Sequence, residues 1–256
     1  MGLSLGLIGG GGSILTVPIL VYLFKQDPLT ATTASLFIVG TTAFVGALFY
    51  ARKKSIDFKT ALLFATPSFV GVFIARHFIL PSIPNHILSI LGFTFTKPLL
   101  VMGLFGITMV FASRAMIRSG SDMAAPLDSS KTSPSLAVMI GQGFLIGVTT
   151  GFVGAGGGFL IIPALVLLLK LPMKMAVGTS LAIIAANSLF GFTISARNPY
   201  LEWPVLIKIA AIGIIGIAIG QFYSSRLNEK LLKRSFGYFV LLIGSLVLLD
   251  QILKMA

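Results

Sequence analysis

The chain has 256 residues, of which 56% are apolar and 10% charged. A soluble domain carries about 25% charged residues, so the composition excludes an ordinary globular protein and indicates a membrane protein with several spans. The 19 Lys and Arg residues against 7 Asp and Glu residues lie in short clusters between apolar runs. This is typical of cytoplasmic loops, so we expect a lipid bilayer and no nucleic acid as partner.

The first half of the chain contains a Gly-interrupted apolar unit and then three further apolar segments. They span residues 2–24, 30–51, 58–80 and 86–112. Most of these runs suit a helix of about 20 residues that crosses a bilayer. Lys97-Pro98 lies inside the fourth segment and predicts a kink there. The N-terminal run has no basic flank and no cleavage site, so we expect it to belong to the mature protein.

The second half follows the same order after a polar, Ser-rich stretch at 113–134, which predicts a flexible linker. Its apolar segments span residues 136–170, 175–195, 203–224 and 235–253. Residues 136–170 are too long for one crossing, and Gly154–Gly158 divide them into arms of about 18 and 12 residues. We therefore divide the chain into a first repeat at 1–112, the linker, and a second repeat at 135–256.

The two halves are copies of one sequence repeat. A shift of 145 residues aligns 2–76 with 147–221 without a gap, and 21 of those 75 positions are identical. The best stretch sets GGGGSILTVPIL at 9–20 against GAGGGFLIIPAL at 154–165. The second copy has about ten residues before the aligned part, so either the first arm is short or the natural chain begins earlier.

Loop charge distinguishes two topologies for the Gly-interrupted units. If each unit crosses the membrane, the basic residues divide nine against eight and specify no orientation. If each unit is a hairpin, thirteen basic residues share one side: Arg52, Lys53, Lys54, Lys59, Arg114, Arg118, Lys131, Lys170, Lys174, Arg226, Lys230, Lys233 and Arg234. The other side keeps only Lys25, Arg76, Arg197 and Lys254. We therefore predict hairpins, and a hairpin plus three crossings is an odd number, so the second repeat enters from the opposite face.

The expected fold is an all-α membrane protein with two inverted-topology repeats, each a Gly-broken hairpin plus three transmembrane helices. A Gly-rich turn that leads into a helix presents free N–H groups and the positive end of the helix dipole, which together attract an anion. Inversion would bring the two hairpin tips together near the midplane. The candidate tip residues are Gly11, Gly12, Ser13, Gly156, Gly157 and Gly158. The alternative is that these glycines only allow close helix crossing.

The segments after the hairpins supply side-chain donors. Ser35 and Thr42 recur as Ser180 and Asn187, and the spacing of 7 puts each pair on one helical face. Thr179 lies beside Ser180. Hydroxyl and amide donors bind an oxyanion without a fixed charge, which leaves the binding weak enough for release. The alternative is that such hydroxyls bond to carbonyls of their own helix.

Ionisable groups inside apolar segments are functional candidates by default. Lys97 and Lys208 lie within such segments, and Arg76 and His77 lie at the end of another. His77 is a candidate proton carrier, so protons are a candidate coupling ion.

Catalytic and metal-binding patterns are missing from the sequence. Cysteine is absent, and the two histidines lack metal-site spacing. No Walker loop and no G-x-S-x-G elbow occur. We therefore expect no enzyme activity, no cofactor and no metal.

The stretches GLIGGGGSILTVPIL with TATTASL, and TTGFVGAGGGFLIIPALVLLLKLPMKMAVGTSLAIIAANS, resemble the sulfite exporter TauE/SafE family of membrane permeases. The resemblance covers essentially the whole chain. It implies a permease that exports small sulfur-containing or organic anions, such as sulfite or a sulfonate, using an ion gradient. It also implies binding at the paired Gly motifs. Within the matched pattern, Ser13 replaces the glycine that the second copy has as Gly158.

The expected function is secondary transport of a small anion by alternating access, in a multi-pass protein of the plasma membrane. Two alternatives remain open from the sequence: an anion channel of the same architecture, and a non-transporting membrane scaffold or sensor. The oligomeric state is also open, and a homo-oligomer is one of the possibilities.

Overall fold

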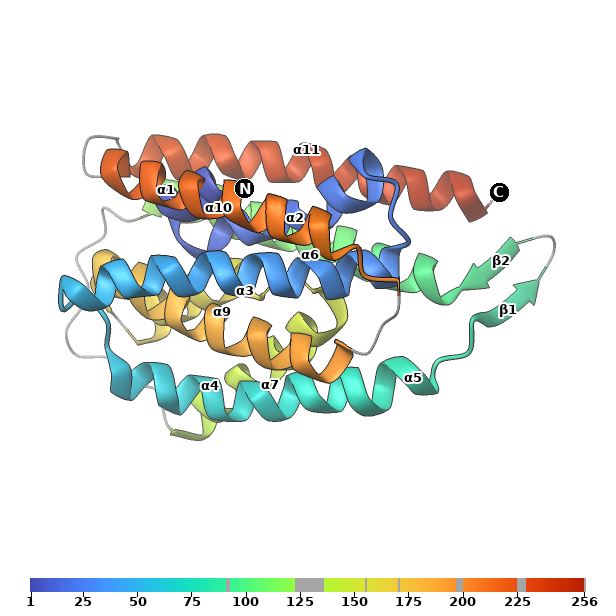
Figure 1. The fold of residues 1–256 in the computed structure, drawn as a ribbon, viewed down its shortest axis with the longest axis horizontal. Coiled ribbons are helices and arrows are strands. Elements are labelled where there is room, and N and C mark those ends of the chain that lie inside the picture. Colours follow the sequence, from blue (N-terminus) through green and yellow to red (C-terminus); the bar gives the residue numbers. More distant parts are fainter. Residues whose placement is uncertain are drawn as a thin grey trace.

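The structure is a computed structural model, and it describes residues 1–90, 93–122, 136–154, 156–169, 171–196, 200–224 and 229–255. Long helices lie side by side as one elongated bundle, with a β-hairpin projecting from one end (Figure 1). In the first half the helical elements are α1 (Gly2–Ile8), η1 (Gly10–Leu15), α2 (Thr16–Pro18), η2 (Ile19–Leu23), α3 (Pro28–Arg52), α4 (Phe58–Phe73), η3 (Ile74–Ile79), α5 (Leu80–Ser82) and α6 (Lys97–Asp122). In the second half they are α7 (Leu136–Val153), α8 (Gly158–Pro163), η4 (Ala164–Leu168), α9 (Met173–Ser195), α10 (Trp203–Ser224) and α11 (Glu229–Met255).

Residues 86–90 and 93–96 are strands, so the prediction of a kinked helix over 86–112 is wrong. His86–Ile90 (β1) and Phe93–Thr96 (β2) pair as an antiparallel hairpin, and the fold is helical apart from it within the described residues. β-branched and aromatic residues in these two short runs favour strands. Helix α6 begins at Lys97 because Pro98 fits only the first turn, where its missing N–H needs no partner.

The predicted linker at 113–134 begins inside a helix. Helix α6 continues to Asp122, so the first ten residues of that stretch are helical. Residues 123–135 lie outside the described part of the chain.

Two aspartates begin helices in the first half. Asp27 accepts hydrogen bonds from the backbone N–H groups of Leu29 and Thr30 at the start of α3. Asp57 accepts from the N–H of Thr60 at the start of α4. Such caps satisfy donors that have no partner inside the helix.

Helices α3 and α9 cross at the centre of the bundle and run antiparallel. A Cβ atom added to Gly46 would lie 3.2 Å from Leu181 Cδ1, and one added to Gly191 would lie 3.1 Å from Leu36 Cδ1. These two contacts are the same contact with the halves exchanged, because Gly46 and Leu36 match Gly191 and Leu181 in the repeat. The glycines allow the two helices to approach closely.

The other main helix pairs follow the same exchange. Helix α1 packs on α10 as α7 packs on α4, and α3 packs on α10 as α9 packs on α4. Helix α6 packs on its counterpart α11. At the level of residues, Gly6 meets Gly220 as Gly151 meets Ala75, and the two contacts again differ by the shift of 145.

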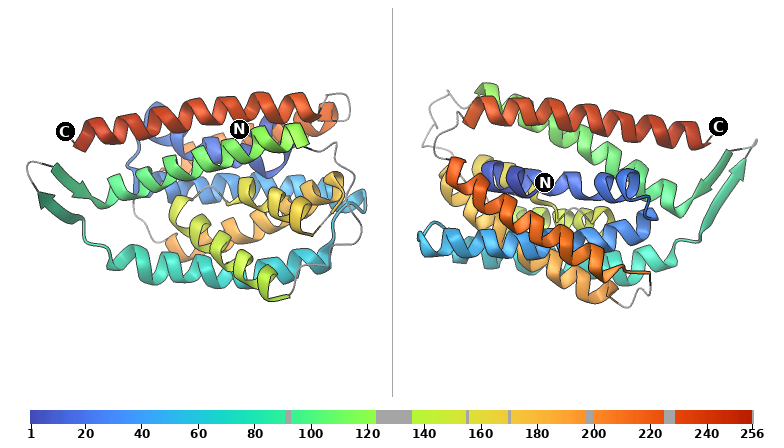
Figure 2. Two further views of the ribbon diagram at one scale, coloured as in Figure 1. Left: turned by 180° about the vertical axis from the view of Figure 1, so that it is seen from behind. Right: turned by 45° about the horizontal axis from the view of Figure 1, so that its top comes forward.

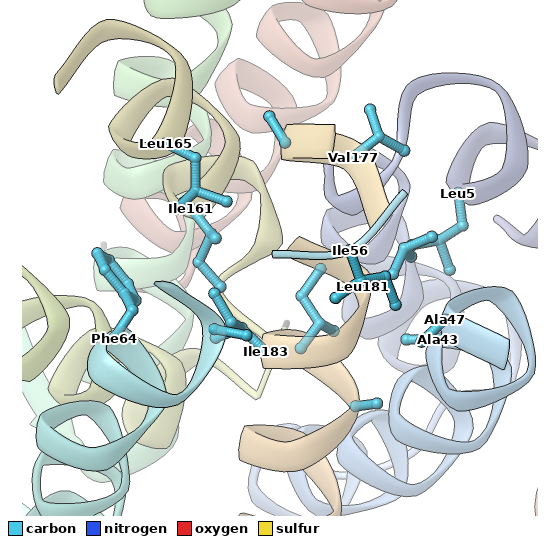
Figure 3. Close-up of a cluster of buried hydrophobic side chains, with 14 of the residues drawn as sticks. Leu5, Ala43, Ala47, Ile56, Phe64, Ile161, Leu165, Val177, Leu181 and Ile183 are labelled. Atoms are coloured by element: carbon cyan, nitrogen blue, oxygen red, sulfur yellow. The ribbon is translucent and has the colours of Figure 1, made fainter. Parts of the chain in front are cut away.

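The core surrounds α9. Figure 3 shows Phe64 from α4 and Ile161 and Leu165 from the α8–η4 arm on one side of α9, and Leu5 from α1 with Ala43 and Ala47 from α3 on the other. These side chains are fully or nearly fully buried. Helix α9 therefore joins the two glycine units to the rest of the bundle.

The elongated bundle has two ends that differ in the elements they contain. The end of α3 and the starts of α4, α9 and α11 lie at the left of Figure 1, whereas the β-hairpin and the C-terminal end of α11 lie at the right (Figures 1 and 2). The left end thus carries the basic turn Arg52–Lys54, together with Lys59 and Lys174.

Candidate functional site

The glycine segments of the two halves touch each other in the middle of the fold. A Cβ atom added to Gly10 in η1 would lie 2.6 Å from the Cα atom of Gly158, the first residue of α8. Only glycine allows two backbones to approach this closely. The expected meeting of the two Gly units is therefore present.

The break between α7 and α8 depends on left-handed backbone. Gly154, Gly156 and Gly157 have φ angles of 71°, 68° and 66°, which side chains other than glycine rarely adopt. The bounds of α7 and α8 confirm the predicted interruption of residues 136–170. A Cβ atom added to Gly156 would lie 2.8 Å from Ser188 Oγ and 2.9 Å from Val39 Cγ1, so α9 and α3 both face this turn.

The break in the first half differs from the predicted one. Gly9 alone has a positive φ, 74°, and Gly10–Leu15 already form a 3₁₀ helix. The sequence predicted that Gly11, Gly12 and Ser13 form the turn before the arm. They lie inside the arm instead. The Ser13 hydroxyl donates to the Gly10 carbonyl at 2.8 Å, which is a local helix bond.

Buried polar atoms without a hydrogen-bond partner collect around the second break. A buried polar group without a partner is costly in a protein interior and points to a ligand, a water or a functional role. In the described part of the chain these atoms include Ser35 Oγ, Arg76 Nη2, Thr150 Oγ1, Asn187 Oδ1 and Ser188 Oγ. We call these five residues the polar cluster.

Four helices place the polar cluster around Gly154–Gly157. Thr150 is so close to Gly157 that a Cβ atom there would overlap its hydroxyl, and Ser188 faces Gly156. Ser35 lies one turn from Val39, which also faces Gly156. Asn187 on α9 donates from Nδ2 to Ser68 Oγ of α4 at 2.7 Å, which leaves its Oδ1 as an acceptor without a partner.

The remaining predicted donors have local or remote partners. Thr42 and Ser180 donate to carbonyls of their own helices, those of Ile38 and Val177, at 2.7 and 2.8 Å. Thr179 accepts a hydrogen bond from the Asp57 backbone N–H at 3.0 Å. Through this bond Thr179 joins α9 to the loop before α4.

The carboxyl of Asp57 is held in its charged form. Hydrogen bonds from the Thr60 side chain and backbone hold the pKa of the Asp57 carboxyl below its usual value.

Arg76 lies inside the protein, and counting it among loop charges in the sequence was wrong. Its side chain is 6% exposed. Its Nε donates to the Gly151 carbonyl at 2.7 Å, and Nη1 donates to Thr33 Oγ1 and Ser195 Oγ at 2.9 and 3.1 Å. The sequence signal that could have placed it in the site is the presence of a charged residue within an apolar segment.

The other ionisable candidates lie away from the polar cluster. His77 is exposed, and its ring stacks on Phe73 with centroids 5.0 Å apart. Lys208 is exposed on α10, and Lys97 begins α6. In the described residues no group of three His, Cys, Asp or Glu side chains could hold a metal ion.

Residues 1–247 match the protein family described as "Sulfite exporter TauE/SafE". The chain belongs to the TauE/SafE family. It is 30% identical to a "Probable membrane transporter protein" of Xylella fastidiosa, over 97% of this chain and 91% of that protein. It is 26% identical to "Probable membrane transporter protein YunE" of Bacillus subtilis, over 96% and 93% of the two chains. No solved structure matches it.

As in a multi-pass transporter family, the helices of this TauE/SafE protein suit a bilayer. Six helices in the described residues are long and apolar enough to cross a membrane: Pro28–Arg52, Phe58–Ser82, Lys97–Arg114, Leu136–Val153, Lys174–Ser195 and Trp203–Tyr223. Large apolar side chains such as Phe111, Ile212 and Leu246 are exposed. A lipid surround accounts for this exposure, since water would disfavour it. The protein is a multi-pass membrane transporter.

Proposed function

We propose that this TauE/SafE protein is a secondary transporter that exports a small anion of the sulfite or sulfonate class. The observation that carries the proposal is the polar cluster, because it places four donor groups without partners and one such acceptor, Asn187 Oδ1, around a glycine break in the middle of an apolar bundle. Groups that have no protein partner in a buried position are suited to a polar ligand that comes and goes. The family's description supports the sulfite class.

The two halves act as inverted repeats in this proposal. Support comes from the antiparallel crossing of α3 and α9, together with contacts that recur when the halves are exchanged. A two-fold axis that exchanges two antiparallel helices is perpendicular to the helices. For helices that span a membrane, this axis lies in the membrane plane. Rocking of one repeat against the other would then open the site to each side in turn.

Substrate release requires weak binding, and hydroxyl groups suit that need. Ser35, Thr150 and Ser188 offer neutral donors, and the turn before α8 adds backbone N–H groups. The predicted tip residues Gly156, Gly157 and Gly158 would let the anion approach the backbone. A proton gradient would drive the outward movement.

Flux into proteoliposomes tests the proposal. Purified protein is reconstituted, and entry of sulfite and of sulfoacetate is measured with and without a proton gradient. We expect a saturable flux that the gradient accelerates. Absence of flux for every anion of this class would sink the proposal, and flux that rises without saturation would identify a channel instead.

A further inference from the structure

Arg76 is the one charged side chain that is buried in the described part of the chain. A guanidinium keeps its proton throughout the neutral pH range. A buried charge without compensation is unfavourable, and proteins normally pair it with an opposite charge. The charge of Arg76 therefore needs compensation from the groups around it.

Its protein partners carry no net charge. The three hydrogen bonds go to the Gly151 carbonyl and the hydroxyls of Thr33 and Ser195. Gly151 lies in the last turn of α7, so the negative end of that helix dipole compensates a part of the charge. No carboxylate contacts the guanidinium in the described residues.

The guanidinium also has donor capacity left over. Its Nη2 atom is buried and has no hydrogen-bond partner in the described residues. The Ser195 hydroxyl accepts from Nη1, and its own proton has no acceptor there. An incoming anion would therefore meet two donors and a positive charge at one place.

The position of Arg76 relates it to the glycine break. Gly151 is one turn before Gly154, and Gly154 is so close to Thr32 that a Cβ atom there would overlap it. Thr33, the next residue of α3, is bonded to Arg76. The guanidinium thus lies between the break and the end of the bundle where α9 ends at Ser195.

The other half of the repeat carries a neutral side chain at the position of Arg76. The residue that matches Arg76 is Gln221, which donates from Nε2 to the Gly46 carbonyl at 3.2 Å. Gly6 and Gly151 pack in equivalent ways in the two halves. The same repeat position therefore holds a neutral side chain that bonds to α3 in one half, and in the other half it holds a cation that bonds to α7, α3 and α9.

Building on the transport function proposed above, we propose that Arg76 binds the substrate anion directly through Nη2, with Ser195 as a second donor. The group bound is an oxyanion with a single negative charge, such as a sulfonate or hydrogen sulfite. One guanidinium compensates one such charge, whereas a dianionic group would remain buried with an excess charge. Charge-assisted hydrogen bonds from a guanidinium suit oxyanions geometrically.

Thermal unfolding of the purified protein in detergent tests this site without any transport step. The probes are sodium methanesulfonate and dimethyl sulfone, which is a neutral molecule of nearly the same shape. At about ten times its dissociation constant, methanesulfonate should raise the Tm of the wild type by about 3–6 °C. Dimethyl sulfone should leave the Tm unchanged, and equal shifts for both probes would overturn the proposal.

The variant Arg76→Gln places the residue of the other half in this position. We expect it to lose the methanesulfonate shift, while Gln221→Leu, the matched control, keeps it. A full shift in Arg76→Gln would overturn the proposal.

If Arg76→Gln does not fold, Arg76→Lys decides. An ammonium cannot hold three acceptors and an anion together, so the shift should fall by at least half, and a shift equal to that of the wild type would overturn the site. Absence of flux in wild-type proteoliposomes would be a separate result, which contradicts transport but not anion binding.

Discussion

The two glycine units match in sequence but differ in how their polar groups are satisfied. In the first unit one glycine, Gly9, has a positive φ, the Ser13 hydroxyl is bonded within its own helix, and Thr16 retains a buried hydroxyl without a partner. In the second unit three glycines have a positive φ, and four buried hydroxyl or amide side chains around the turn retain an atom without a partner. The buried cation Arg76 also contacts α7 of the second unit.

The difference separates scaffold from chemistry. A duplicated backbone gives both halves the same helix contacts, because glycines at matched positions set the same approach distances. Side chains then differ between the matched positions, and both halves contribute to the polar cluster: Ser35 and Arg76 come from the first half, and Thr150, Asn187 and Ser188 come from the second. In a transporter built from repeats, the break around which unpaired polar atoms collect is the candidate ligand site.

The largest expected effect is at the glycine breaks. Gly157→Val should abolish flux, because a branched side chain must adopt a left-handed φ and would overlap the Thr150 hydroxyl. Gly12→Val should also abolish flux, since a Cβ atom there would lie 2.5 Å from Leu5 N. Flux of sulfite or sulfoacetate in proteoliposomes is the measurement.

A control for this prediction lies on α7 itself. A Cβ atom added to Gly141 meets nothing within 4 Å. Gly141→Ala should therefore leave flux unchanged and hold or slightly raise stability, because alanine favours a helix by about 1 kcal/mol over glycine. Wild-type flux in either valine variant would show that the glycine breaks are not part of the transport site.

The sequence predicts the helices well where apolar runs are long and glycine or proline interrupts them. A break in 136–170 follows from length, because a 35-residue segment is too long for one crossing, and Gly154–Gly158 indicate its position. The strands at 86–90 and 93–96 were missed because short apolar runs carry no period that separates a strand from a helix.

The sequence cannot predict which buried polar side chains lack a hydrogen-bond partner. Ser35 and Ser180 occupy the same repeat position, yet only Ser180 donates to its own helix. That difference depends on a side-chain rotamer and on the neighbours that the tertiary fold supplies. The burial of Arg76 likewise depends on α3, α7 and α9 closing around η3.

A smaller effect distinguishes these two matched serines. Ser35→Ala removes a buried hydroxyl without a partner, so the free energy of unfolding should stay equal or rise by up to about 1 kcal/mol. Flux should nevertheless fall about tenfold, as expected for the loss of one ligand hydrogen bond. Ser180→Ala should lower stability slightly and leave flux within about twofold.

Thermal unfolding and proteoliposome flux of both variants give the answer. Equal losses of flux in Ser35→Ala and Ser180→Ala would show that the unpaired hydroxyl is not what matters. A loss of stability in Ser35→Ala would show that the Ser35 hydroxyl has a structural partner.

The smallest expected effect is on stability, at two helix starts that match in the repeat. They are Asp57 before α4 and Glu202 before α10. Asp57 caps its helix, whereas Glu202 makes no such side-chain bond in the described residues, so Asp57→Ala should cost about 1 kcal/mol and Glu202→Ala almost nothing. The pKa of Asp57 is lowered in the folded protein. The stability that its ionised carboxyl contributes is therefore fully present above the unfolded pKa of about 3.9. The contribution disappears as the pH falls through the lower, folded pKa. The Tm difference between wild type and Asp57→Ala, measured in detergent from pH 7 downward, should therefore shrink only below about pH 4; a difference that is constant with pH would mean that the carboxylate charge does not contribute to the cap.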